Sequence, residues 1–194
     1  MNIKKLKESE KEFLQTYPDG FKDVQMEVIA KKHKMDKMVH FTQEAFKKTN
    51  FKNTQQVLDN MIKVVSRSSM VSVFEKPKFR DYVLALNEKD EENLIKSLKW
   101  LLHGNTQKGF ELMLEVLKPG KLAKWTLVTI WLTYYKPTEE VFVKPTTAKG
   151  VIQYFDLKYI IYKPTPTWAF YTAYKQYITS MKSKVKTSLS PSNA

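Results

Sequence analysis

The feature that most restricts the fold is the stretch of residues 122–135, in which apolar side chains occupy nearly every face of a helix. A helix that is apolar all round lies either in a protein interior or in a membrane. Its uncharged part, residues 125–135, is eleven residues long, whereas a helix needs about 20 to cross a bilayer. The sequence therefore predicts a central buried helix and no transmembrane segment.

The other apolar residues recur mostly at the spacing of amphipathic helices. Asn53, Asn87 and Asn105 each precede such a run and can cap a helix there. A last helix is expected to begin with Pro166 as its first residue. The predicted core includes Leu98, Leu101, Leu102, Leu114, Trp125, Val128, Trp131, Ile152 and Trp168.

Two short β-prone runs interrupt the helical patterns, at residues 141–143 and 159–162. Apart from these runs, the periodicity favours about eight to ten helices over the whole chain. We therefore expect a mainly α fold: a multi-helix globular array with a minor β element near 141–143 and 159–162.

Size and composition are those of one domain. With 194 residues and 42% hydrophobic content, the chain is long enough to bury a core of its own. We expect one globular domain over residues 1–181, with a candidate internal boundary near 118–121 and a basic, aromatic-rich part over 121–181. Residues 182–194 lack aromatic side chains and predict a disordered tail.

The chain contains no cysteine. This absence excludes disulfides, thiolate metal sites and cysteine nucleophiles, and it fits an intracellular, cytoplasmic setting. With only five glycines, the sequence also lacks a dinucleotide fingerprint, a phosphate loop and a nucleophile elbow. We therefore expect no cofactor and no catalytic residues.

Basic residues strongly outnumber acidic ones, with 33 Lys and Arg against 20 Asp and Glu. The excess is greatest from Lys118 onward, where twelve lysines accompany three acids. Such a charge makes polyanions the first partners to consider. Lysines contact phosphates rather than base edges, and only Arg67 and Arg80 are arginines. The leading hypothesis is non-enzymatic binding of DNA or RNA through the phosphate backbone, with low sequence specificity.

A Lys-Pro-Thr motif recurs in this basic region, at residues 136–138, 144–146 and 163–165. The proline holds the lysine extended, and the threonine can cap a following helix, whose N-terminus attracts anions. Twelve aromatic residues lie between Tyr134 and Tyr177, and any exposed one can stack on an unpaired base. The expected anion-binding residues are Lys136, Lys144, Thr146, Thr147, Lys149, Lys163 and Thr165.

A sharper version of this hypothesis is a winged helix. Residues 121–134 and 146–155 would form its helix–turn–helix, and residues 158–163 its wing. Thr146, Thr147, Lys149 and Gln153 would then face the DNA groove. The eleven residues between the two helices are more than the three or four of the usual turn.

Two other function classes stay open. His33, Asp36 and His40 would share one face of a single helix and are weak candidates for zinc or iron ligands, as in a metal-dependent enzyme. Neighbouring lysines would repel a cation there. The rival to nucleic-acid binding is an α-helical protein-interaction or regulatory module whose basic surface only maintains solubility.

Overall fold

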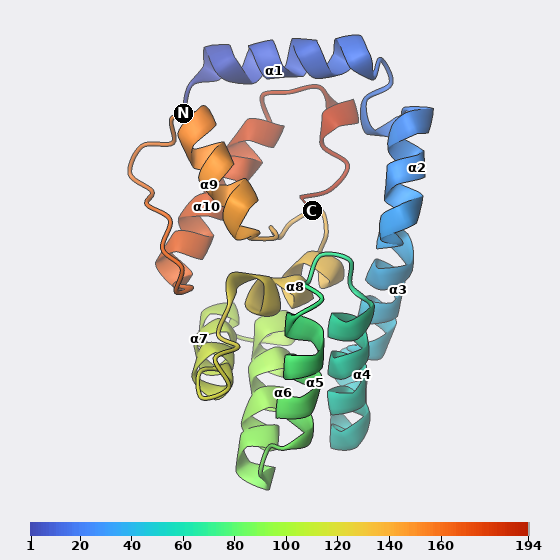
Figure 1. The fold of residues 1–194 in the computed structure, drawn as a ribbon, viewed down its shortest axis with the longest axis vertical. Coiled ribbons are helices and arrows are strands. Elements are labelled where there is room, and N and C mark those ends of the chain that lie inside the picture. The colour runs from blue at the N-terminus through green and yellow to red at the C-terminus, as the bar shows by residue number, and fades with distance from the viewer. Residues whose placement is uncertain (194) are drawn as a thin grey trace.

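The computed structural model describes residues 1–193, and in these residues it contains ten α-helices, three short 3-10 helices and no strand (Figure 1). The mainly α prediction is therefore confirmed. The α-helices are α1 (Ile3–Thr16), α2 (Val24–His33), α3 (Met35–Ala45), α4 (Thr54–Arg67), α5 (Glu75–Leu84), α6 (Glu88–His103), α7 (Thr106–Leu117), α8 (Trp125–Tyr135), α9 (Pro145–Tyr154) and α10 (Trp168–Lys182). The 3-10 helices are η1 (Gly20–Lys22), η2 (Lys48–Lys52) and η3 (Thr187–Leu189).

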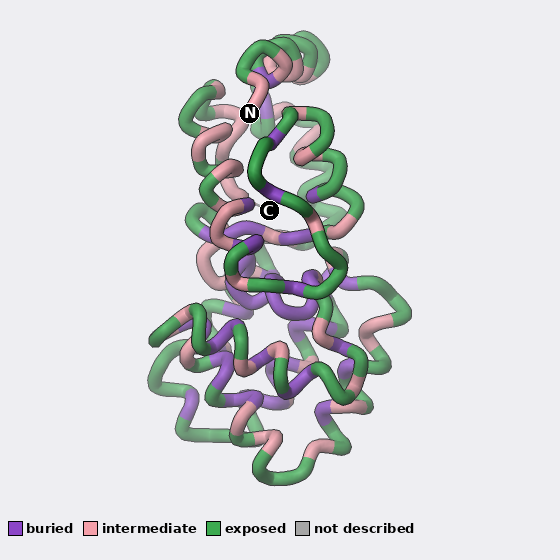
Figure 2. Tube along the Cα trace, turned by 90° about the vertical axis from the view of Figure 1, so that its left-hand side faces the viewer, coloured by how far each residue is buried: buried purple, intermediate pink, exposed green. Residues whose placement is uncertain are grey.

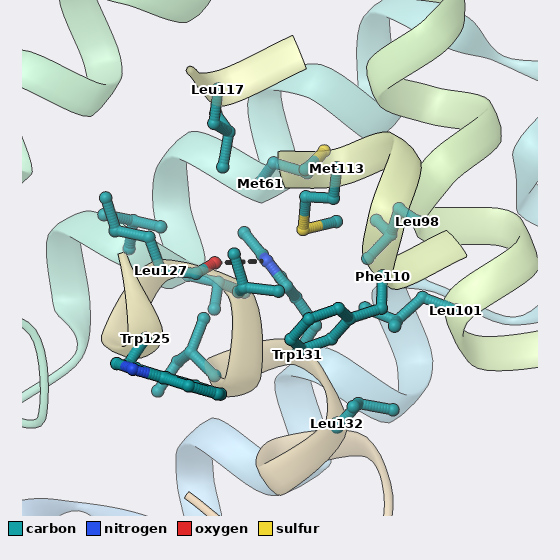
Figure 3. Packing of buried hydrophobic residues seen from close by; sticks show 14 of the residues in the cluster. Met61, Leu98, Leu101, Phe110, Met113, Leu117, Trp125, Leu127, Trp131 and Leu132 are labelled. Carbon is teal, nitrogen blue, oxygen red and sulfur yellow. Dashed lines mark hydrogen bonds between the residues drawn. The ribbon is translucent and has the colours of Figure 1, made fainter. Parts of the chain in front are cut away.

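Helix α8 is the central buried helix that the apolar run predicts. Nine of its eleven residues are buried. Its two buried threonine hydroxyls bond to its own backbone: Thr129 donates to Trp125 O at 2.7 Å, and Thr133 donates to Thr129 O at 2.9 Å. The Trp131 indole N–H donates to Leu127 O of the same helix at 2.8 Å, the bond drawn dashed in Figure 3. The helix can therefore be surrounded by apolar side chains without leaving these polar groups unsatisfied.

The other helices form two groups around α8 (Figure 1). Helices α4 to α7 lie side by side on one side of it, and α9 and α10 lie on the other. Helix α1 crosses the far end of the second group, and α2 and α3 run along one edge. One hydrophobic cluster, with members from Met38 to Tyr174, includes residues from both sides of position 120.

Most of the predicted core is buried. The exceptions are Leu114, Ile152 and Trp168, which are only half-buried and pack at the edge of the cluster. The three asparagine caps also form as predicted. Asn53, Asn87 and Asn105 each accept a backbone N–H from the first turn of α4, α6 and α7.

The expected β element is wrong, because residues 141–143 and 159–162 form no strand. Val143 N–H donates to Thr129 Oγ1 at 3.1 Å, so the side chain of a helix takes the place of a neighbouring strand. In the second run, Ile160 is buried while the residues on either side of it are exposed. The first run lies on α8, whereas the second begins in a turn at Tyr159, which has a left-handed backbone conformation with φ 67°. A lone segment with alternating burial gives the same sequence pattern as a strand.

Of the predicted tail, residues 182–194, Lys182 is the last residue of α10 and Ala194 lies outside the described residues. Residues 183–193 make specific contacts. Lys186 N–H donates to Glu10 Oε1 of α1 at 2.7 Å. Asn193 N–H donates to Pro137 O, also at 2.7 Å. These bonds hold the segment across the end of the molecule that α1 covers, where the composition predicts disorder.

Candidate nucleic-acid interface

A pocket of about 510 Å³ brings together four remote parts of the chain. We call it the Lys144 pocket. It lies where the starts of α5, α8 and α9 meet the connection between α9 and α10. Its lining consists of residues 69–72, Glu75, residues 124–126, residues 144–146, Tyr162 and Pro164.

The N-terminus of α9 opens at this pocket with unbonded amide groups. Pro145 is its first residue and has no N–H, and no side chain caps the helix. The first bonded amide is that of Ala148, which donates to Lys144 O at 2.8 Å. No described acceptor bonds the amides of Thr146 and Thr147. These two N–H groups and the positive end of the helix dipole favour an anion.

The threonines of the Lys-Pro-Thr motif do not act as predicted. Thr146 lies inside the first turn of α9 and caps nothing. Thr165 precedes α10 but is not its cap, because Thr167 accepts the amide of Phe170 at 3.3 Å. Helix α10 therefore starts at Trp168, two residues later than Pro166 would place it.

Glu75 supplies the one negative side chain in the lining of the Lys144 pocket. Its Oε1 lies 2.9 Å from Lys124 Nζ, and its Oε2 accepts a 3.0 Å hydrogen bond from Thr126 Oγ1. This carboxylate therefore neutralises Lys124. Lys144 forms no ion pair among the described residues, so its charge remains available to a ligand.

Lys149 and Lys163 lie beside the pocket. The Nζ of Lys149 is 5.1 Å from the centre of the Tyr162 ring, within cation–π range. Partial burial raises the pKa of the Tyr162 phenol. The carbonyl of Lys163 accepts a 2.8 Å hydrogen bond from Trp125 Nε1, while its side chain is exposed. Neither lysine forms an ion pair among the described residues.

The seven predicted anion-binding residues do not form one site. Lys144 and Thr146 line the Lys144 pocket. Thr147 and Lys149 follow them on α9, and Lys163 and Thr165 flank Pro164, which also lines the pocket. Lys136 lies beyond the opposite end of α8, about 16.5 Å along the helix axis from Trp125. The sequence does not indicate that Lys124 and Glu75 belong to this pocket. Both are remote from α9 in the chain, and no local pattern marks residues that come together only through folding.

The winged-helix arrangement is not formed. Residues 136–144 separate α8 from α9, which is far more than the usual turn of this motif. Residues 158–163 form no strand and thus no wing. The Lys144 pocket is therefore built differently, from the starts of α5, α8 and α9 and the connection between α9 and α10.

The three candidate metal ligands do not lie on one helix. Lys34 adopts a left-handed conformation with φ 51°, which ends α2 at His33 and separates it from α3. His33 Nδ1 instead lies 3.0 Å from Ser69 Oγ. Among residues 1–193, no group of three His, Asp or Glu side chains is placed to hold a metal ion.

Most aromatic side chains of the C-terminal region belong to the hydrophobic cluster or pack against it. Of the twelve aromatic side chains between Tyr134 and Tyr177, only those of Tyr154 and Tyr159 are exposed. Tyr154 is 48% exposed and lies under Lys5 Nζ, whereas Tyr159 is 99% exposed. Tyr159 is therefore the one aromatic ring of this region that stands fully in solvent.

The chain matches no protein-family model, and neither a curated protein nor a solved structure matches it. In the described chain, every helix is too short or too polar to cross a bilayer. Any assignment of function therefore rests on the chemistry of the surface itself.

Proposed function

We propose that this protein binds nucleic acid through backbone phosphates at the Lys144 pocket and the lysines beside it, without enzymatic activity. The observation that carries the proposal is the start of α9. There the unbonded amides of Thr146 and Thr147 open next to Lys144, which forms no ion pair among the described residues. A phosphate oxygen can accept from such amides while the lysine supplies the opposite charge.

The surrounding charge supports the same ligand. From residue 141 to the C-terminus the chain has eight lysines and a single acid, Asp156. A surface so poor in acids attracts a polyanion over several ångströms and loses that attraction in salt. Backbone recognition of this kind carries little sequence information, since amides and lysines contact phosphates and not base edges.

The test compares two triple charge reversals that change the net charge equally. Lys144→Glu, Lys149→Glu and Lys163→Glu alter the proposed site. Lys63→Glu, Lys89→Glu and Lys99→Glu alter exposed lysines on α4 and α6, in the other helix group. Affinity for labelled 20-mer single-stranded and duplex DNA and RNA is measured by fluorescence anisotropy at 50 and 200 mM salt.

We expect the site triple to weaken binding more than about 10-fold and to reduce the salt slope by about two to three. The control triple should change affinity much less. Equal loss in both triples would show that binding depends on net charge alone and would contradict this site. Absence of wild-type binding at 50 mM salt would contradict the function.

One observation favours the rival class, a protein-interaction module. Helix α2 buries none of its residues and exposes Val24, Val28 and Ile29. Exposed apolar side chains grouped on one helix are typical of a protein contact. Substituting these three residues by Ser should leave oligonucleotide binding unchanged if α2 has such a separate role, and anisotropy measures this directly.

A further inference from the structure

Tyr159 is placed where folding gains little from an aromatic ring. Its side chain is 99% exposed, and the neighbouring Ile161 is 79% exposed. Burial of apolar surface stabilises the folded state, so a ring left in water contributes almost nothing to it. Tyr159 also adopts a left-handed backbone conformation with φ 67°, which is uncommon for a residue other than glycine. Such positions cluster at functional sites.

The segment that carries Tyr159 is held on both sides of it. Before it, Leu157 N–H donates to Ile152 O at 3.0 Å, and the hydroxyl of Tyr177 donates to Lys158 O. After it, Ile160 is buried in the hydrophobic cluster. The segment, residues 157–162, lies along the front of the view in Figure 2, and buried residues alternate in it with exposed ones. The exposed ring is therefore presented from a fixed backbone, which reduces the entropy lost when it binds a ligand.

The same segment leads directly to the Lys144 pocket. Tyr162 lines the pocket and lies three residues after Tyr159, a backbone span of at most about 11 Å. Lys158 precedes Tyr159 and forms no ion pair among the described residues. A chain of phosphates bound at the pocket would thus continue past a free lysine and an exposed aromatic ring.

We infer that Tyr159 stacks on a base and that the ligand of this surface is single-stranded nucleic acid. This inference rests on the proposed function and names its substrate class. Bases in a duplex already stack on one another and leave no face for the ring, whereas an unpaired base offers one. Stacking on aromatic side chains is tolerant of sequence, as is phosphate binding by lysine.

Exposed Tyr and Ile side chains among lysines could also bind a membrane surface with anionic lipids. Single-stranded nucleic acid is favoured here because the segment presents only two such side chains, and they adjoin a pocket with free helix amides. Membrane binding would need a larger buried apolar area. The experiment includes vesicles so that the two ligands are distinguished.

The experiment uses the full chain with Tyr159→Ala, Tyr159→Phe and, as a matched control, Ile161→Ala. Each is titrated against labelled 20-mer oligothymidine and against a 20-base-pair duplex, and sedimented with vesicles of phosphatidylserine and phosphatidylcholine. Tyr159→Ala should weaken single-strand binding about 10-fold, leave duplex binding within twofold, and leave the salt slope unchanged. Tyr159→Phe should retain wild-type affinity because it keeps the ring, and Ile161→Ala should do the same.

Each other outcome overturns the inference in a recognisable way. If Tyr159→Ala binds single strands as well as wild type while the site triple does not, stacking is wrong and phosphate binding stands. If the wild type binds no oligonucleotide, the proposed function fails as well. Loss of vesicle binding in Tyr159→Ala and Ile161→Ala, with oligonucleotide binding intact, would assign the segment to a membrane. Thermal unfolding monitors the fold, which an exposed substitution should not change.

Discussion

The indole Nε1 of Trp125, a core residue at the start of α8, donates a 2.8 Å hydrogen bond to the carbonyl of Lys163. This bond joins the buried helix to the exposed segment between α9 and α10. Because the carbonyl belongs to a residue of the candidate interface, we expect this bond to restrict the motion of that interface.

Trp125→Phe should loosen the interface, and Trp131→Phe is its matched control. Both substitutions remove a buried indole N–H, but Trp131 donates to Leu127 O within its own helix, also at 2.8 Å. Each should lower the free energy of unfolding by about 1–3 kcal/mol. Only Trp125→Phe should speed hydrogen exchange in residues 158–165. Equal exchange rates in the two variants would contradict an anchoring role for this bond.

Gly109→Ala and Gly150→Ala should have opposite effects on stability. A Cβ on Gly109 of α7 would lie 2.7 Å from both Leu101 Cα and Ser97 O of α6, so the two helices would have to separate at a cost of about 1–3 kcal/mol. A Cβ on Gly150 of α9 meets no atom within 4 Å. There, the better helix propensity of alanine should stabilise by about 0.5–1 kcal/mol. Urea denaturation of both variants measures this, and a stable Gly109→Ala would show that the helices can shift.

The protein should lose stability at alkaline pH through its buried tyrosines. Burial raises the pKa of Tyr174 to about 12. Burial, followed by the adjacent Glu140 carboxylate, raises the pKa of Tyr171 well above its ordinary value. The raised pKa means that the unfolded chain releases its proton first as pH rises above about 10. The contribution of the protonated tyrosine to the free energy of unfolding is thus complete below about pH 10. It is lost between pH 10 and 12, at about 1.4 kcal/mol per pH unit for Tyr174.

Tyr174→Phe isolates this contribution. Urea denaturation of wild type and variant at pH 8, 10 and 11 should show a shallower decline for the variant, because one titrating group is gone. Some dependence should remain from Tyr171. A variant whose stability declines as steeply as that of wild type would contradict the assignment to Tyr174.

Glu75→Gln should strengthen oligonucleotide binding if the proposed function holds. The amide can still accept the hydrogen bond from Thr126 Oγ1, but it no longer neutralises Lys124. We expect a few-fold gain in affinity at 50 mM salt, which should largely disappear at 200 mM. Glu111→Gln, on the exposed face of α7, removes the same charge at a distance and serves as control. An equal gain in both variants would indicate a general charge effect.

The helical part of the fold was predictable because its causes are local. The apolar run of residues 122–135 could be satisfied only in an interior, and α8 occupies one. Asn87 caps α6 by accepting the amide of Asp90 at 3.0 Å, an interaction that spans three residues. The β element failed for the converse reason. Strand pairing needs a remote partner, and the alternation at residues 159–162 arises from a lone segment with Ile160 buried.

By itself, the sequence determined the helices, most of the core and the excess of lysine toward the C-terminus. Each follows from residues within a few turns of one another or from simple counting. The tertiary structure alone decided that Lys144 lines one pocket with Ser72 and Glu75, more than 65 residues earlier in the chain, and that Lys136 lies elsewhere. It also decided that Tyr159 stands in solvent while Phe155 and Tyr162 are partly buried. The physical reason is that exposure and convergence depend on which remote helices pack together, and helical periodicity records only which face is apolar.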